Sequence, residues 1–320
     1  MVVITRGAAP LSFLVGDGEE LVGCTSQGVP TIVAHFAADE SDLSELQNIR
    51  AQERALLALP EDDRNAAWMA MSPLLAGFSE NEASFRALES LYTRGQVQFN
   101  GLSGVKDGGL FQAWSECYTN ARAVRERRTL TVNLLIRAVK ARIALYPERR
   151  VELASIASGS ARCVLETLKQ LEGANVHARM LDHDEHARTY CMQLAYEMGL
   201  PDQVQVLTGD VLRVARSPLK AYPIDVAEAV GIFDYLDDAF ARFLIKQIRH
   251  LLSEGGFVLA SNVMDNPERE FLHSVIGWRP MEYRTESEFV DLFLQAGFRV
   301  EDCLVHRIPT GVYCIVEATK

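Results

Sequence analysis

The stretch VELASIASGSARCVLETLKQL, residues 151–171, decides the fold of this chain. It begins with a short apolar run typical of a buried strand, continues through small residues, and ends with the spacing of an amphipathic helix. A strand that runs through a tight loop into a helix is the layout of a nucleotide-binding turn. Such turns usually carry two or three glycines, whereas this one carries only Gly159. The turn is therefore either an altered cofactor site or an ordinary loop.

The sequence that follows repeats this alternation of apolar strands and helices. We expect further strands in residues 176–184, 204–210, 224–233 and 257–263. Apolar strands that alternate with helices predict a doubly wound, mostly parallel α/β sheet with right-handed crossovers. Close to the C-terminus, residues 299–308 and 311–319 are two strands joined by a very short link. So short a link predicts an antiparallel hairpin, which makes the last strand antiparallel.

The sequence that precedes residue 151 has a different character. Residues 1–38 mix β-branched runs with turns and predict a small arm that contains strands, and residues 40–148 predict a helical cap. Ser41 is a candidate N-cap, with Glu45 nearby. The glycine-rich residues 100–114 predict a loop. We therefore expect an arm and helical cap over residues 1–148 and a cofactor-binding α/β domain over residues 149–320.

Composition limits the classes of partner. The 320 residues carry 32 Lys and Arg against 43 Asp and Glu, a net charge of −11, which disfavours nucleic-acid binding. The basic run RAVRERR, residues 122–128, is interpreted as a solvated helix face. Six cysteines without C-x-x-C spacing indicate free thiols, and the absence of a signal pattern or a long apolar stretch predicts a cytoplasmic chain without membrane contact. A small-molecule substrate fits this chain, and a homodimer stays open.

Four sequence motifs in residues 151–320 resemble those of a known family. They are the turn SIASGSAR, Asp182 in MLDHDEHA, Asp210 in VLTGDVL, and the segments GIFDYL and LLSEGGFVLASNV. In this order they resemble the class I S-adenosylmethionine (SAM)-dependent methyltransferases. Within that superfamily, GIFDYL followed by NPEREFLHSVIGWRPMEYRTESEF, residues 266–289, resembles a bacterial branch with a helical N-terminal cap that acts on small molecules or lipids. The resemblance implies SAM as cofactor and methyl transfer to a small acceptor in small-molecule biosynthesis.

The resemblance also implies where SAM binds. Small residues of the turn would let the backbone approach the aminoacyl part, Asp182 would accept the ribose hydroxyls, and Asp210 would accept the adenine amino group, with Val211 and Leu212 beside the base. Helix N-capping is the competing interpretation of Asp182 and Asp210. The full set of expected cofactor-binding residues is Ser155, Ala157, Gly159, Asp182, His183, Asp210, Val211 and Gly231.

The turn departs from the family pattern at three positions. Ser155 takes the place of the usual acid, and Ala157 and Ala161 take the places of two glycines. Alanine is tolerated there if its backbone angles are ordinary. The missing acid normally holds the α-ammonium group of SAM, and a hydroxyl stabilises that charge less well, so the amine should lose its proton more easily.

A neutral α-amine on SAM would make a second reaction possible. Some proteins of this fold cyclise SAM: the amine attacks the γ-carbon, methylthioadenosine leaves, and azetidine-2-carboxylate forms. The sequence thus leaves three functions open, which are methyl transfer, an azetidine-2-carboxylate synthase-like cyclisation of SAM, and a SAM-binding regulatory protein without catalysis.

The candidate catalytic residues are Tyr235, Asn262 and Tyr283, which follow the fourth and fifth strands or precede the last helix. Aromatic faces stabilise a sulfonium by cation–π attraction of roughly 0.5–2 kcal/mol. The further candidates for the reactive side, weighed against packing or a surface position, are Asp234, Trp278, Arg284, Tyr118, Asn120, Asn133, Arg125 and Arg127.

Metal and thiol chemistry are disfavoured. DHDEH, residues 182–186, places His183 and His186 within one helical turn, but Asp182 is assigned to ribose and no third ligand is evident, so we expect no metal. Cys163 and Cys191 lie in helices beside the expected site without a charged partner, which favours buried packing.

Overall fold

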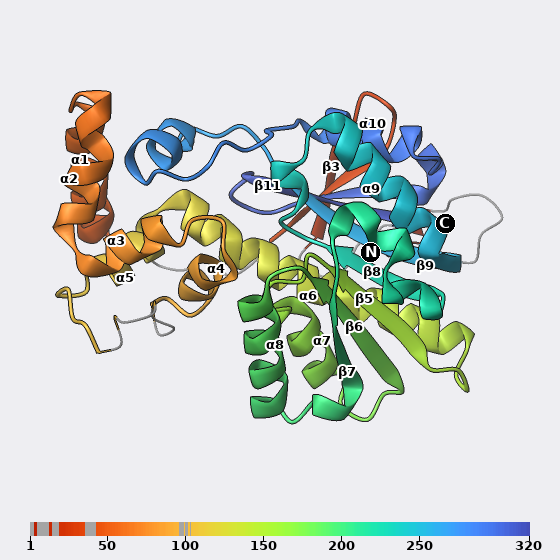
Figure 1. The fold of residues 1–320 in the computed structure, drawn as a ribbon. Helices are drawn as coiled ribbons and strands as arrows, with labels where there is room; N and C mark the ends of the chain where they lie inside the picture. The colour runs from red at the N-terminus through yellow and green to blue at the C-terminus, as the bar shows by residue number, and fades with distance from the viewer. Residues whose placement is uncertain are drawn as a thin grey trace.

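The computed structural model describes residues 3–4, 13–14, 19–35, 43–95, 99, 102 and 104–320. A large α/β body and a helical cap make up this described part, and the cap lies to one side of the sheet (Figure 1). Ser41, the expected N-cap, lies outside the described residues.

The body is built on a mixed sheet that counts nine strands in the described part of the chain. From edge to edge they are β3 (Glu19–Cys24), β4 (Pro30–Ala34), β10 (Cys303–Arg307), β11 (Tyr313–Thr319), β9 (Leu252–Val263), β8 (Ile224–Ala229), β5 (Val151–Ile156), β6 (Val176–Asp182) and β7 (Val204–Thr208). The five central strands from β9 to β7 are parallel, and β11 is antiparallel to both β9 and β10. The expected doubly wound sheet with a reversed last strand is confirmed.

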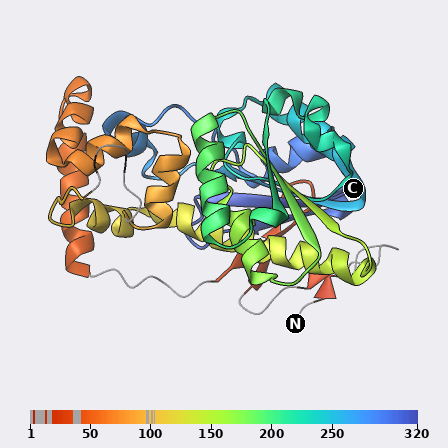
Figure 2. The same ribbon diagram turned by 60° about the horizontal axis from the view of Figure 1, so that its bottom comes forward.

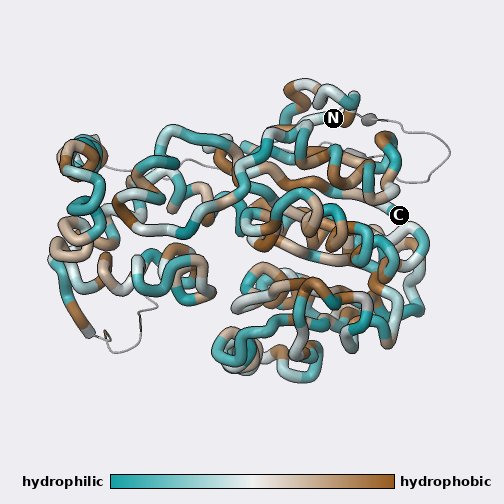
Figure 3. The backbone as a smooth tube through the Cα atoms, turned by 45° about the horizontal axis from the view of Figure 1, so that its top comes forward, coloured by the Kyte–Doolittle hydropathy of each residue, from teal (hydrophilic) through white to brown (hydrophobic). Residues whose placement is uncertain are grey.

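Helices cover both faces of this sheet. They are α6 (Thr119–Leu145), α7 (Arg162–Gln170) and α8 (Glu185–Glu197) on one face, and α9 (Asp238–Leu251) and α10 (Glu286–Gln295) on the other. Alternate residues of β5 divide between the two cores: Leu153 packs with the first group, and Ala154 and Ile156 with the second. This period of two is why the strand is apolar on both faces. Figure 3 shows the hydrophobic segments gathered in the sheet layers.

The N-terminal arm joins the sheet. The strand β4 runs parallel to β10 and pairs with β3, so both belong to the body although they precede the cap in sequence. A separate pair of short strands, β1 (Val3–Ile4) and β2 (Phe13–Leu14), is antiparallel.

The cap consists of α1 (Leu43–Leu57), α2 (Glu61–Met71), α3 (Pro73–Glu80), α4 (Phe85–Tyr92) and α5 (Leu110–Cys117), together with the first turns of α6. Ser72 and Ser84 cap α3 and α4 with their side-chain oxygens. The prediction of a loop over residues 100–114 is wrong from residue 110 onward, because helix α5 begins at Leu110. Gly109 has φ +87° there and turns the chain so that Phe111 and Trp114 are buried.

Two segments tie the cap to the body. The helix α6 runs from the cap across the sheet, and the connection between β9 and α10 reaches back into the cap, where the π-helix Phe271–Val275 lies beside α2 (Figures 1 and 2). Asn65 of α2 donates to the carbonyls of Val275 and Ile276. Both α6 and the connection between β9 and α10 therefore join the cap to the body.

Candidate functional site

A cavity of about 640 Å³ opens at the carboxyl ends of the central strands, beneath α4 of the cap. This is where ligands bind in open α/β sheets, and the volume falls within the range of small-molecule sites. Seven of the eight expected cofactor-binding residues line it, namely Ala157, Gly159, Asp182, His183, Asp210, Val211 and Gly231. Ser155 is fully buried behind this lining.

The opening turn is strained at the two alanines. Ala157 has φ +56° and Ala161 has φ +53°, beside Gly159 at +52°. The condition of ordinary backbone angles is therefore not met, and each alanine adopts the left-handed conformation at a cost of about 1–2 kcal/mol. The backbone keeps the path of a glycine turn. The Gly159 N–H donates to Oδ2 of Asp182 over 2.7 Å, which fixes the turn against the second strand.

Asp182 and Asp210 differ in their local roles. Asp182 is not a helix cap, because Asp184 accepts the N–H of His186 at the start of α8. The Oδ1 of Asp182 accepts the Asp184 N–H over 2.9 Å and lies 3.5 Å from Nδ1 of His183, so each carboxylate oxygen accepts one hydrogen bond and retains capacity for another. Asp210 does cap the short helix that follows it, through the Leu212 N–H, and it also lines the cavity.

The carboxylate missing from the turn is present on the neighbouring strand. The Ser155 hydroxyl donates to Oε2 of Glu228 over 2.5 Å, and the Val230 N–H donates to Oε1 over 2.9 Å. Glu228 lines the cavity, and burial raises its pKa to about 7. We did not expect this residue from the sequence. The available signal was an acid near the carboxyl end of the strand IDVAEA, residues 224–229.

The helix α4 closes the cavity from the cap side with Ser84, Phe85, Leu88 and Tyr92. On the same helix, the fully buried Glu89 accepts from Arg162 Nε over 2.9 Å, from the Ser160 hydroxyl over 2.6 Å and from the Tyr190 hydroxyl over 3.1 Å. These contacts fasten α4 to the turn and to α7 and α8.

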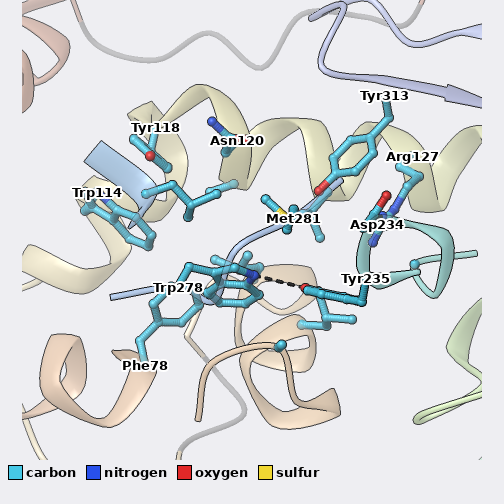
Figure 4. A pocket seen from close by; sticks show the side chains of 17 residues that line it. Phe78, Trp114, Tyr118, Asn120, Arg127, Asp234, Tyr235, Trp278, Met281 and Tyr313 are labelled. Atoms are coloured by element: carbon cyan, nitrogen blue, oxygen red, sulfur yellow. Dashed lines mark hydrogen bonds and ion pairs between the residues drawn. The ribbon is translucent and has the colours of Figure 1, made fainter. Parts of the chain in front are cut away.

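A second, smaller cavity of about 60 Å³ lies between the cap and the body (Figure 4). We call it the reaction chamber. Its aromatic lining comprises Phe78, Trp114, Tyr118, Tyr235, Trp278 and Tyr313. The Trp278 Nε1 donates to the Tyr235 hydroxyl over 3.0 Å, the dashed line of Figure 4. Both cavities are lined by Ala83, Leu88, Gly231 and Tyr235, so the chamber adjoins the larger cavity there. We call the larger one the cofactor cavity because the expected cofactor-binding residues line it.

A buried ion pair lies at one end of the chamber. The Nη1 of Arg127 is 3.3 Å from Oδ2 of Asp234, both residues are about 2% exposed, and the guanidinium lies 4.2 Å from the centre of the Tyr313 ring. The interpretation of residues 122–128 as a solvated face is therefore wrong for Arg127, because one side of α6 packs into the body. Burial raises the pKa of Asp234, against the opposing effect of Arg127.

Three polar atoms of the chamber residues are buried without a hydrogen-bond partner among the residues that the structure describes. They are Nε1 of Trp114 and Nε of Arg127, both donors, and Oδ1 of Asn120, an acceptor. The amide nitrogen of Asn120 donates to Asn266 and Glu268, which sets the orientation of the side chain. Buried groups of this kind usually have partners. They mark positions where a ligand can bind.

Other candidates lie outside the lining of both cavities. Asn262 is fully buried; it donates to the carbonyls of Val263 and Glu282 and accepts from Arg284. The Tyr283 hydroxyl is 2.8 Å from Nε2 of His273. These contacts give Asn262 and Arg284 a role in holding the loops after β8 and β9.

The remaining candidates have surface or packing positions. Asn133 is exposed on α6, and Arg125 donates to the carbonyl of Ser115. Cys163 lines the cofactor cavity, but burial raises its pKa, and burial also raises the pKa of Cys191 to about 12. Neither thiol is therefore activated as a thiolate.

Comparison with known proteins assigns the class. A family model described as "Putative methyltransferase" matches residues 117–319, which is more than half of the chain, so the chain belongs to this family. No curated protein matches the sequence. No described helix is long and apolar enough to cross a membrane.

Solved structures agree on the fold. A "possible exported protein from Bordetella parapertussis" is 18% identical with a TM-score of 0.62, covering 89% of this chain and 97% of its own. The "S-adenosylmethionine-dependent methyltransferase SibL" is 15% identical with a TM-score of 0.50, covering 87% and 74%. The chain is therefore a member of a methyltransferase family, and it shares its fold with a SAM-dependent methyltransferase.

Proposed function

We propose that the chain transfers the methyl group of SAM to a small, largely apolar acceptor bound in the reaction chamber. The observation that carries this proposal is the contact of the two cavities at Gly231 and Tyr235. A cofactor whose ribose binds Asp182 and whose adenine binds beside Asp210 and Val211 would direct its sulfonium toward that junction.

Residues of the chamber supply orientation and exclusion of water. SAM supplies a methyl group on a sulfonium, which an acceptor nucleophile displaces. The ring of Tyr235, held by Trp278, is available to stabilise positive charge at the junction. The apolar lining keeps water away from the reacting atoms. Asp234 is the carboxylate of the chamber, and its raised pKa suits it to accept the proton that an acceptor hydroxyl loses.

The unpaired donor of Trp114 and the unpaired acceptor of Asn120 support an acceptor with a polar group that both accepts and donates, such as a hydroxyl. The test is to add small alcohols, phenols, carboxylates and amines to protein with SAM and to measure S-adenosylhomocysteine. We expect release with one of the hydroxyl-bearing acceptors. Failure of the wild-type protein to bind S-adenosylhomocysteine by calorimetry would overturn the proposal.

One observation favours cyclisation of SAM as a second candidate. The chamber of about 60 Å³ is less than half the size of an apolar cavity of about 150 Å³ that binds benzene. A reaction without an acceptor would need no more room. In it the neutral amine forms a bond to the γ-carbon, the carbon–sulfur bond breaks, methylthioadenosine leaves with the electron pair, and the ring nitrogen loses a proton.

Mass spectrometry separates the two candidates. Protein is incubated with SAM and no added acceptor. Methylthioadenosine with azetidine-2-carboxylate in equal amounts would establish cyclisation. SAM that stays bound and unchanged would rule out cyclisation, and the added acceptors would then separate methyl transfer from SAM binding without catalysis.

A further inference from the structure

The strand β8 carries a buried carboxylate, Glu228, on which Arg127 acts electrostatically without forming an ion pair. Glu228 is 6% exposed, lines the cofactor cavity, and is bound by the Ser155 hydroxyl and the Val230 N–H. Among the described residues, no cation forms an ion pair with it at contact distance. A carboxylate buried in a sheet is costly unless it is paired. Its position therefore points to a cationic partner that arrives with a ligand.

Geometry places this carboxylate beside the turn. Ser155 and Glu228 are register partners on the parallel strands β5 and β8. Neighbouring strands lie about 4.8 Å apart, so a carboxylate on β8 is displaced by only one strand from a carboxylate at position 155. Ser155 is fully buried, and Glu228, whose carboxylate accepts its hydroxyl, is part of the cavity lining.

We propose that Glu228 is the residue that binds the α-ammonium group of SAM, in place of an acid at position 155, with Ser155 holding its carboxylate in position. This inference rests on the proposed use of SAM. Compared with the family pattern, the carboxylate has moved from β5 to the adjacent strand β8, and the ammonium group keeps a negatively charged partner. Ser155 is a positioning residue in this arrangement.

Two probes isolate the ammonium contact. S-adenosylhomocysteine carries the α-ammonium group, whereas methylthioadenosine has the same adenosine part without it. We expect Glu228→Gln to weaken S-adenosylhomocysteine binding roughly 10- to 100-fold, the range for a lost charge-assisted hydrogen bond, and to change methylthioadenosine binding less than about twofold. The matched control Asp182→Asn should weaken both probes equally, because both carry the ribose.

A double variant that moves the carboxylate from β8 to β5 tests the same inference while the site keeps its negative charge. Ser155→Asp combined with Glu228→Ser exchanges the carboxylate and the hydroxyl between the strands, and we expect it to recover binding of S-adenosylhomocysteine relative to Glu228→Gln. Equal loss for both probes in Glu228→Gln, or no loss for either, would overturn the inference. Wild-type protein that binds neither probe would instead overturn the proposed function.

Discussion

Arg127 and Asp234 form an ion pair that is buried between α6 and the loop after β8, at the end of the reaction chamber. Asp234 also accepts the Val263 N–H over 2.8 Å, so the pair joins the cap helix to the carboxyl ends of β8 and β9. A buried pair is expensive to break from one side, because the other charge is then left without a partner.

We expect Arg127→Met to lower the free energy of unfolding by about 3–5 kcal/mol. Adding Asp234→Asn should restore most of this loss, because the asparagine keeps an acceptor for the Val263 N–H and carries no charge. Urea unfolding of the two single variants and the double variant measures the coupling. Additive losses would show that the two side chains act independently.

Asp182→Ala is expected to weaken binding of S-adenosylhomocysteine by about 1.5–3 kcal/mol, because charge-assisted hydrogen bonds to the ribose are lost. Calorimetry measures the affinity. The matched control is Asp237→Ala, which removes the N-cap of α9 outside the lining of both cavities. It should cost about 1 kcal/mol of stability and leave the affinity unchanged. Unchanged affinity in Asp182→Ala would disprove the ribose assignment.

Ala157→Gly should stabilise the fold, although most such changes destabilise. Ala157 has φ +56°, so glycine at this position removes about 1–2 kcal/mol of backbone strain from the folded state. Glycine also makes the unfolded chain more flexible, which lowers the free energy of unfolding by about 0.4–1 kcal/mol. A net gain of about 0.5–1 kcal/mol is expected from thermal or urea unfolding. Ala51→Gly, at an exposed position in the middle of α1, is the matched control and should lose about 1 kcal/mol. A loss at both positions would contradict the strain.

The stability of the cofactor-free protein should fall as the pH rises from 4.5 to 7. Burial raises the pKa of Glu228 from 4.5 to about 7, while Ser155 and Arg127 act against this shift. The folded state therefore binds more protons than the unfolded state in this window. The contribution, on the order of 3 kcal/mol, is complete below pH 4.5 and is lost as the pH approaches and passes 7. Cys163 of α7 also faces this carboxylate, and its thiol stays protonated throughout.

Unfolding in urea at several pH values checks this slope, and Glu228→Gln should reduce it, while Asp234 and Glu53, whose pKa values are also raised, keep a remainder of the same sign. Glu317 provides an internal contrast. Although burial acts to raise its pKa, the ion pair with Arg137 lowers it to about 2, so its contribution is lost only as the pH falls below 4.5. A slope that is undiminished in Glu228→Gln would assign the titration to another group.

The strands of the body were predictable because each is a short apolar run bounded by turn residues, as in residues 151–156 and 204–208. The positions of Asp182 and Asp210 at the cofactor cavity followed from the same pattern, since parallel strands end at one edge. Their ligands stay predictions. The left-handed angles of Ala157 and Ala161 were not predictable, because alanine adopts them only where the surrounding structure imposes them.

The role of Glu228 and the burial of Arg127 were not predicted from the sequence, for a different reason. Both depend on neighbours that are distant in sequence: Ser155 is 73 residues from Glu228, and Asp234 is 107 residues from Arg127. Periodicity within one element says which side of a helix or strand is apolar, but it does not say which charged side chain a distant element will bring to it.

The continuity of α6 has a mechanical consequence. Its 27 residues extend about 40 Å at the rise of an α-helix, so one uninterrupted rod belongs to the cap at its start and to the sheet at its end. The cap cannot rotate as a rigid lid about that helix without bending it. We therefore expect ligand entry to depend on displacement of α4, the element fastened by Glu89. Hydrogen exchange should show α4 opening before α6 does.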